Sequence, residues 1–221
     1  MTSDLDSIKC LLFDLDGVIL DTLELKGKIF VEIFKDFPEL SDRILKYHLD
    51  NGGVSRRIKI QYINEFILKR KITQNELESM FDLFSELIKD NLPNIELFPN
   101  VKYVLGELKK SGFSIFSISS MPITEAELIL NHLSVRHYFN GIIDTSNGKI
   151  NAIKKFISQQ KLSTNEILYL GDSNEDLNAA LIHNIRFILV GNSTVKSSSQ
   201  IFLHSNNIDV LLDLLNSKDT K

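Results

Sequence analysis

Apolar residues along the chain gather in short runs that alternate with stretches of helical spacing. Four runs, at 8–13, 113–119, 167–171 and 186–190, have the length and continuity of strands that are buried on both faces. Weaker strand candidates lie at 141–144 and 201–204, and helical spacing covers 100–110, 124–133, 149–160 and 175–184. Strands that alternate with helices of this length predict βαβ units and an α/β fold with a doubly wound parallel sheet.

The segment from 21 to 93 breaks this alternation. Its apolar residues recur at helical spacing, and no strand candidate interrupts them. Helices are predicted to start at Ser41-Asp42 and after Thr73, which Glu76 follows in the spacing of a capping box. We therefore predict a Rossmann-like core, formed by residues 1–20 and 94–221, with an inserted helical cap domain at 21–93. The alternative, that these helices belong to the main layer, stays open.

Composition and charge narrow the classes of function. The 221 residues are 43% hydrophobic and 24% charged, which suits a globular protein with a sizeable core. Twenty-five Lys and Arg oppose 29 Asp and Glu, and this acidic balance argues against a nucleic-acid partner or an anionic membrane surface. No apolar run approaches the length of a membrane span. The single cysteine, Cys10, excludes an internal disulfide framework, and we expect a cytoplasmic protein.

Acidic residues stand at the ends of two predicted strands. Asp14 and Asp16 follow the first strand, and Asp172 and Asp176 follow the strand at 167–171. The carboxyl ends of parallel strands meet at one edge of the sheet, where clustered carboxylates repel one another unless a cation or a proton intervenes. Oxygen ligands favour Mg²⁺ over zinc. The alternative readings are a simple turn after the first strand and a helix cap after the second.

These residues carry a resemblance to the haloacid dehalogenase-like superfamily. Residues 13–19 (FDLDGVI) resemble its first motif, and residues 171–176 (GDSNED) resemble its fourth. The apolar strand at 113–119 resembles the second motif, which ends in Ser or Thr. Lys149 stands 23 positions before Asp172, where the lysine of the third motif is usually found. The helical insert falls where the phosphatase-like branch carries an α-helical cap.

The resemblance implies a role for each motif residue. Asp14 would be the nucleophile that forms an aspartyl-phosphate, and Asp16 the general acid and base. Ser119 would hold a phosphoryl oxygen, and Lys149 would neutralise charge on the transferring group. Other residues compete for the last two roles, namely Ser117 and Ser120 in the second motif, and Lys154 and Lys155 in the third.

The resemblance also implies a set of binding residues. The Mg²⁺ ion would be held by Asp14, the Asp16 backbone carbonyl, Asp172 and Asp176. Substrate contacts would come from Gly17 and Ser120 in the core and from Gly53 and Arg56 in a cap loop. A plain helix start, capped by Ser55, explains the cap loop equally well.

The implied activity is Mg²⁺-dependent hydrolysis of a small phosphorylated metabolite, either a sugar phosphate or an organic acid phosphate. Asp16 stands where dehalogenases carry an aromatic residue, so dehalogenation is not expected. Two alternatives remain, a hexose phosphate mutase of the β-phosphoglucomutase type and a non-catalytic binding or regulatory protein on the same fold. The sequence leaves the choice between a monomer and a homodimer open.

Overall fold

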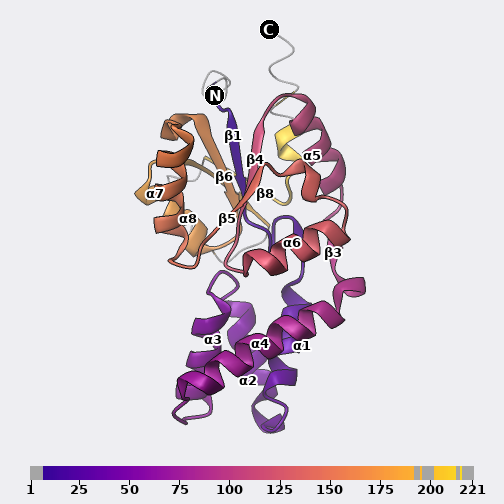
Figure 1. Cartoon of the computed structure of the whole chain (residues 1–221), viewed down its shortest axis with the longest axis vertical. Coiled ribbons are helices and arrows are strands. Elements are labelled where there is room, and N and C mark those ends of the chain that lie inside the picture. Colours follow the sequence, from indigo (N-terminus) through magenta and orange to yellow (C-terminus); the bar gives the residue numbers. More distant parts are fainter. Residues whose placement is uncertain (1–6, 192–194, 196–201, 213–214, 216–221) are drawn as a thin grey trace. The chain divides into compact units, whose positions relative to one another are not determined.

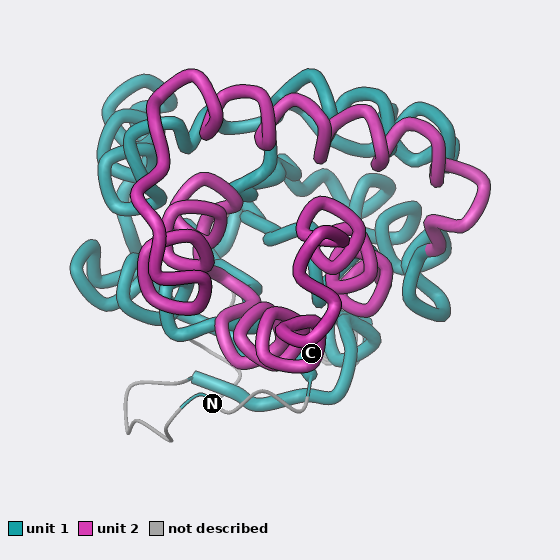
Figure 2. The backbone as a smooth tube through the Cα atoms, turned by 90° about the horizontal axis from the view of Figure 1, so that it is seen from below, with its two compact units in different colours: residues 1–20, 97–221 teal, residues 21–96 magenta. Residues whose placement is uncertain are grey.

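The computed structural model describes residues 7–191, 195, 202–212 and 215. The chain divides into two compact units (Figure 2). Unit 1 takes in residues 1–20 and 97–221, and unit 2 takes in residues 21–96. Within the described residues, no helix combines the length and the apolar character needed to cross a membrane.

Unit 1 is built on a parallel sheet of six strands, in the order β5-β4-β1-β6-β7-β8 (Figure 1). The strands are β1 (Cys10–Phe13), β4 (Ser114–Ile118), β5 (Gly141–Ile143), β6 (Ile167–Gly171), β7 (Arg186–Val190) and β8 (Leu203–Ser205). The prediction of a doubly wound parallel sheet is confirmed. The four continuous apolar runs are the four central strands, and the two weaker candidates are the edge strands. Ile201, in the last candidate, lies outside the described residues.

In the described part of unit 1, helices lie on both faces of this sheet. They are α5 (Val101–Lys110), α6 (Ile123–His132), α7 (Lys149–Gln160) and α8 (Asn174–Ile182). Figure 1 shows α5 and α6 on one face and α7 and α8 on the other. This arrangement follows from the strand order, because right-handed crossovers that run in opposite directions along a sheet lie on opposite faces.

The core on the α7 and α8 side is a layer of aromatic and aliphatic side chains. Leu12 is in register with Tyr169, which is in register with Phe187 on the next strand. All three are fully buried and belong to one cluster with Ile153 and Phe156 of α7. Tyr169 and Phe187 meet edge to face, with ring centroids 5.5 Å apart. Cys10 is buried in the same cluster as a free thiol, and burial raises its pKa to about 12.

Unit 2 is helical, with α1 (Leu23–Ile33), α2 (Ser41–Asp50), α3 (Arg56–Tyr62) and α4 (Gln74–Asp90). Helix α2 begins at Ser41, and Thr73 caps α4 in a capping box with Glu76. Phe30 and Phe84 meet edge to face in the interior, with centroids 4.9 Å apart. Unit 2 also holds a π-helical turn at Ile63–Ile67 and 3-10 turns at Pro38–Leu40 and Leu92–Asn94, and unit 1 holds 3-10 turns at Arg136–Tyr138 and Thr164–Glu166.

One small element was not anticipated from the sequence. Strands β2 (Leu20–Asp21) and β3 (Glu96–Leu97) form a separate two-stranded sheet, at the two points where the chain passes from one unit to the other. Strands of two residues are too short to leave a periodic pattern.

Candidate active site

The first motif places Asp14 directly beyond the end of the central strand β1. The backbone N–H of Asp14 donates to the Leu170 carbonyl of β6 at 2.9 Å, so the strand pairing extends to the motif residue itself. Asp14 is only 4% exposed. Two residues after Asp16, the backbone N–H of Val18 donates to the carbonyl of Leu15 at 3.4 Å and starts a tight turn. The turn holds Asp14 at the carboxyl edge of the sheet.

Gly17 fits this turn for two reasons. Its φ is +80°, a conformation that side chains disfavour. A Cβ atom at Gly17 would lie 2.1 Å from the Asp172 Oδ2, so the Asp172 carboxylate rests against the bare glycine backbone. The first and fourth motifs therefore meet in space as the sequence predicts.

The fourth motif turns from β6 into α8 around Asp176. Ser173 is the N-cap of α8, and its Oγ accepts from the Asp176 backbone N–H while donating to Asp176 Oδ2 at 2.5 Å. The Ser173 backbone N–H also donates to Asp176 Oδ2, at 3.2 Å. A Cβ at Gly171 would lie 2.4 Å from the Asp176 Cβ. The helix-cap reading is therefore correct for Ser173, and the motif serves as cap and candidate site together.

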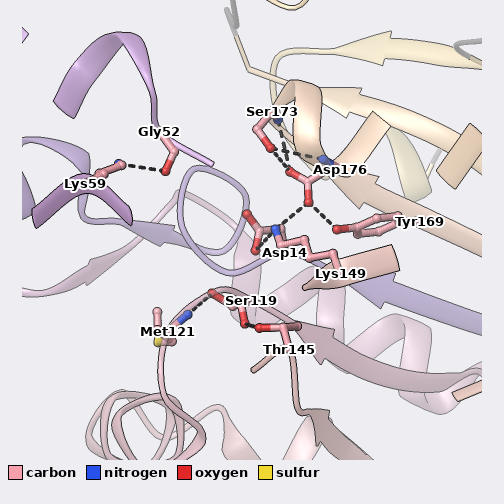
Figure 3. A network of polar contacts seen from close by, with 10 residues as sticks. All are labelled: Asp14, Gly52, Lys59, Ser119, Met121, Thr145, Lys149, Tyr169, Ser173 and Asp176. Atoms are coloured by element: carbon pink, nitrogen blue, oxygen red, sulfur yellow. Dashed lines mark hydrogen bonds and ion pairs between the residues drawn. The ribbon is translucent and has the colours of Figure 1, made fainter. Parts of the chain in front are cut away.

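Lys149 joins the two acidic motifs. Its Nζ lies 3.1 Å from Asp14 Oδ1 and 2.5 Å from Asp176 Oδ1, and the side chain is almost fully buried (Figure 3). Lys149 is the first residue of α7, where the helix dipole disfavours a cation, so the two carboxylates supply the compensating charge. Lys154 and Lys155 of the same helix are exposed. Its burial between the two acidic motifs favours Lys149 over Lys154 and Lys155 as the lysine of the third motif.

Tyr169 completes the network, and sequence reasoning did not identify it. Its hydroxyl donates to Asp176 Oδ1, the oxygen that also accepts from Lys149 (Figure 3). A tyrosine inside an apolar strand has the pattern of a core residue. The available signal was that a buried tyrosine hydroxyl usually requires a hydrogen-bond partner.

The electrostatics of the cluster follow from its burial. Burial raises the pKa of Asp14 well above its usual range, and the nearby carboxylates add to this while Lys149 opposes it. Burial, followed by the charge of Asp176, raises the pKa of Asp172 to about 7. Burial alone would lower the pKa of Lys149, but Asp14 and Asp176 outweigh it and raise that pKa. Protons and metal cations therefore compete for the carboxylates of Asp14 and Asp172.

A divalent cation fits this cluster. One oxygen each from Asp14, Asp172 and Asp176 lies within 4.8 Å of the others, and two oxygens on opposite sides of one Mg²⁺ lie about 4.2 Å apart, so side-chain shifts of about half an ångström bring the acids within reach of one ion. Asp14 Oδ1 is buried and accepts no hydrogen bond from the described residues, and the Lys149 ammonium lies 3.1 Å from it. The three carboxylates and the Lys149 ammonium together leave two negative charges, the charge that one such ion balances.

The predicted serines lie at the end of β4. Ser119 is buried, its Oγ accepts from the Met121 backbone N–H at 3.4 Å, and its carbonyl accepts from Thr145 Oγ1 at 2.6 Å. Ser117 lies inside the strand in register with Phe13, whereas Ser119 lies beyond the strand end. Ser120 is half-buried in the following bend. The position of Ser119 favours it over Ser117 for the second motif.

Gly53 and Arg56 belong to unit 2. Arg56 opens α3, donates to Ser85 Oγ at 2.8 Å and stacks over the Phe84 ring at 3.9 Å. The neighbouring Arg57 is held by both carboxylate oxygens of Glu78, at 2.6 and 2.7 Å. Ser55 is the N-cap residue of α3 but makes no side-chain capping bond. Both arginines are therefore engaged within unit 2, Arg56 as a buried residue against Phe84 and Ser85 and Arg57 in a surface ion pair.

The comparison with protein families matches this arrangement. A family model described as haloacid dehalogenase-like hydrolase matches residues 11–190, a span that contains all four motifs. The chain belongs to the haloacid dehalogenase-like hydrolases. Among the curated relatives, a phosphoglycolate phosphatase from Vibrio cholerae is 27% identical over 184 residues, which cover 79% of this chain and 80% of that protein. A phosphoglycolate phosphatase from Mannheimia succiniciproducens is 26% identical and covers 76% and 79%.

Solved structures share the fold of this haloacid dehalogenase-like hydrolase. A haloacid dehalogenase-like family protein from Streptococcus pneumoniae superimposes with a TM-score of 0.74 at 16% identity, over 95% of this chain and 99% of that one. A β-phosphoglucomutase from Clostridium difficile superimposes with a TM-score of 0.73 at 19% identity, over 97% and 100%. Family and relatives together identify the chain as a hydrolase of the phosphatase type.

Proposed function

We propose that this chain is a Mg²⁺-dependent phosphomonoester hydrolase that acts on a small phosphorylated metabolite through an aspartyl-phosphate. The observation that carries the proposal is the buried cluster in which Asp14, Asp172 and Lys149 converge from three separate parts of the chain. The cluster combines a buried acid, a second acid beside it and a lysine ammonium 3.1 Å from the Oδ1 of the first. A nucleophile aimed at a phosphate needs such positive charge around it.

The proposed reaction proceeds in two displacements. A carboxylate oxygen of Asp14 attacks phosphorus, the ester P–O bond breaks, and the leaving oxygen takes a proton from Asp16. In the second step, Asp16 accepts a proton from water as the water oxygen attacks the same phosphorus. The acyl-phosphate P–O bond then breaks, which releases inorganic phosphate and restores the Asp14 carboxylate.

The other site residues would bind and orient the phosphoryl group. Lys149 would place its remaining donor on a phosphoryl oxygen, and Ser119, with Ser120 and the backbone at Gly17, would hold the others. Asp14, Asp172 and the Asp16 carbonyl would hold Mg²⁺, which offsets the repulsion between the nucleophile and the phosphate dianion. We assign unit 2 the role of the cap, in which Gly53 and Arg56 would read the leaving group.

The substrate class follows from the relatives. The curated relatives are phosphoglycolate phosphatases, and we therefore place a small organic acid phosphate first and a sugar phosphate second. A phosphomutase is the second candidate, because a β-phosphoglucomutase is among the structural neighbours. By resemblance, mutases usually carry glutamate where Gly171 stands, which favours the hydrolase. The free, buried Cys10 supports the proposal of a cytoplasmic location.

The test measures phosphate release from an aryl phosphate with Mg²⁺, with a chelator, and with the Asp14→Asn variant. We expect turnover that the chelator abolishes, and loss of both turnover and phosphoenzyme in Asp14→Asn. A variant that releases phosphate at the wild-type rate would refute the nucleophile assignment. A panel that contains phosphoglycolate and hexose phosphates then identifies the substrate. Incubating hexose 1-phosphate with a bisphosphate primer separates the candidates, because a hydrolase yields inorganic phosphate and a mutase yields hexose 6-phosphate.

A further inference from the structure

The Asp176 carboxylate is fully occupied by donors of the protein itself. Its Oδ1 accepts from Lys149 Nζ and from the Tyr169 hydroxyl, and its Oδ2 accepts from the backbone N–H and the Oγ of Ser173. A carboxylate offers about four lone-pair positions, and these four donors match that number. Asp176 is 0% exposed, and so is Tyr169.

This occupancy separates Asp176 from the other acids of the cluster. Asp14 Oδ1 accepts no hydrogen bond from the described residues and faces only the Lys149 ammonium, at 3.1 Å, among the contacts found there, so it has lone pairs left for a metal ion. Asp176 would have to give up a hydrogen bond for every metal bond that it formed. Proximity alone, with all three carboxylates within 4.8 Å, does not distinguish these two kinds of acid.

We propose that Tyr169 is a positioning residue, whose hydroxyl acts through Asp176 to fix the Lys149 ammonium beside Asp14. Asp176 then serves as the anchor of the lysine, and the cation is held without it. This inference rests on the proposed function, because the lysine is held there to meet a phosphoryl oxygen.

The physical reason lies in how the lysine is held. A lysine ammonium is a point charge on a flexible stem, and it has no preferred direction of its own. Lys149 takes its direction from the two carboxylates that it contacts, at 3.1 Å and 2.5 Å. The Asp176 carboxylate can rotate about its last torsion unless both of its oxygens are bound. Ser173 binds one oxygen, and Tyr169 binds the oxygen that holds the lysine.

The first test is the variant Tyr169→Phe, which removes one hydroxyl and keeps the ring that packs on Phe187. We expect kcat to fall about tenfold, the usual scale for one hydrogen bond to a charged group. The Mg²⁺ concentration for half-maximal activity should stay within about twofold of wild type. Tyr103→Phe is the matched control, because that tyrosine is 61% exposed. A wild-type kcat for Tyr169→Phe would overturn the proposal.

The second test asks whether Tyr169 acts through Asp176. In an Asp176→Asn background, adding Tyr169→Phe should have little further effect on kcat, because residues that act through one another are not additive. Full additivity would overturn the proposal. A rise in the Mg²⁺ requirement of Asp176→Asn of more than about a hundredfold would also overturn it, because the loss of a group that only supports a metal ligand costs about 10–100-fold. If Asp176→Asn does not fold, Ser173→Ala takes its place, since it removes a donor from the same carboxylate.

A binding experiment keeps the inference separate from the proposed function. Isothermal titration with Mg²⁺ alone, and then with inorganic phosphate in the presence of Mg²⁺, needs no turnover. Tyr169→Phe should bind Mg²⁺ as wild type does and bind phosphate several-fold more weakly. If wild type binds both but hydrolyses no phosphate ester, the proposed function fails while the role of Tyr169 stands. Unchanged phosphate binding in Tyr169→Phe refutes that role whatever the activity.

Discussion

Replacing Lys149 by methionine should expose how much the protein depends on this one buried cation. Methionine keeps an unbranched four-atom stem and removes the terminal ammonium with its charge. The ammonium lies 3.1 Å from Asp14 and 2.5 Å from Asp176, both buried, so the variant leaves those carboxylates facing each other without compensation. Removing one partner of a buried ion pair typically costs about 3–5 kcal/mol. For a chain of this size we therefore expect Tm to fall by about 10 °C.

The loss should depend on pH. The pKa of Asp14 is already raised by burial, and Lys149 is the group that lowers it, so removing the lysine raises it further. At pH 5 protons neutralise the unpaired acids, which reduces the loss of stability in Lys149→Met. At pH 8 the acids must either stay charged or take up protons at a greater cost in free energy. The difference in Tm between the variant and wild type should therefore be larger at pH 8 than at pH 5.

The assay is thermal unfolding followed by circular dichroism in the presence of a chelator, at both pH values. Lys154→Met is the matched control, because Lys154 is an exposed lysine on the same helix, and it should change stability by no more than about 0.5 kcal/mol. If Lys149→Met unfolds at the same temperature as Lys154→Met at pH 8, the reasoning on the buried ion pair is refuted.

Two further predictions concern the backbone and the acids of the same site. Gly171→Ala places a Cβ 2.4 Å from the Asp176 Cβ and should lower the free energy of unfolding by at least about 1–3 kcal/mol through overpacking. The control Gly106→Ala in α5, whose Cβ meets nothing closer than 3.9 Å, should be neutral or stabilise the protein by up to about 1 kcal/mol. Chemical denaturation measures both variants, and a Gly171→Ala protein as stable as wild type would contradict the prediction. Without Mg²⁺ the folded state keeps the proton of Asp172, whose pKa is raised to about 7, while the unfolded state releases it near the ordinary value of 3.8. Between these pH values the folded state holds more protons than the unfolded state, so the Tm of chelator-treated protein should fall as pH rises from 5 to 7. Saturating Mg²⁺ should remove that fall. A Tm that rises over this pH range in chelator would contradict the raised pKa of Asp172.

The sequence predicts the central sheet closely because parallel strands are buried on both faces. The runs at 167–171 and 186–190 coincide with β6 and β7, since apart from the opening Arg186 and the Tyr169 hydroxyl their side chains are apolar. The start of α4 could be located for a different reason, because Thr73 and Glu76 form a capping box that depends on local residues alone. The two-residue strands β2 and β3 carry no comparable signal.

The candidate site divides in the same way. The convergence of Asp14 and Asp172 is predictable from the rule that the ends of parallel strands share an edge. The contribution of Tyr169 to the site cannot be predicted in this way, because its contact with Asp176 depends on the direction in which α8 leaves the sheet. The close approach of Gly17 to Asp172 likewise becomes visible only in three dimensions. The hydrophobic pattern of the sequence locates the residues at the ends of strands, and the packing of the folded chain determines which of them are in contact.

The central place of β1 has a consequence for how the protein is made. This strand is translated before its two neighbours, because Cys10 pairs with Ser114 and Ile167, which follow it by 104 and 157 residues. The helices of unit 2 are contiguous in the chain and can pack as soon as they emerge. Asp14 is positioned only after β4 and β6 have both paired with β1, and such long-range pairing is slow. A nascent chain that stops before residue 167 therefore contains all of unit 2 but lacks Asp172, Asp176 and β6, so the candidate site is not assembled.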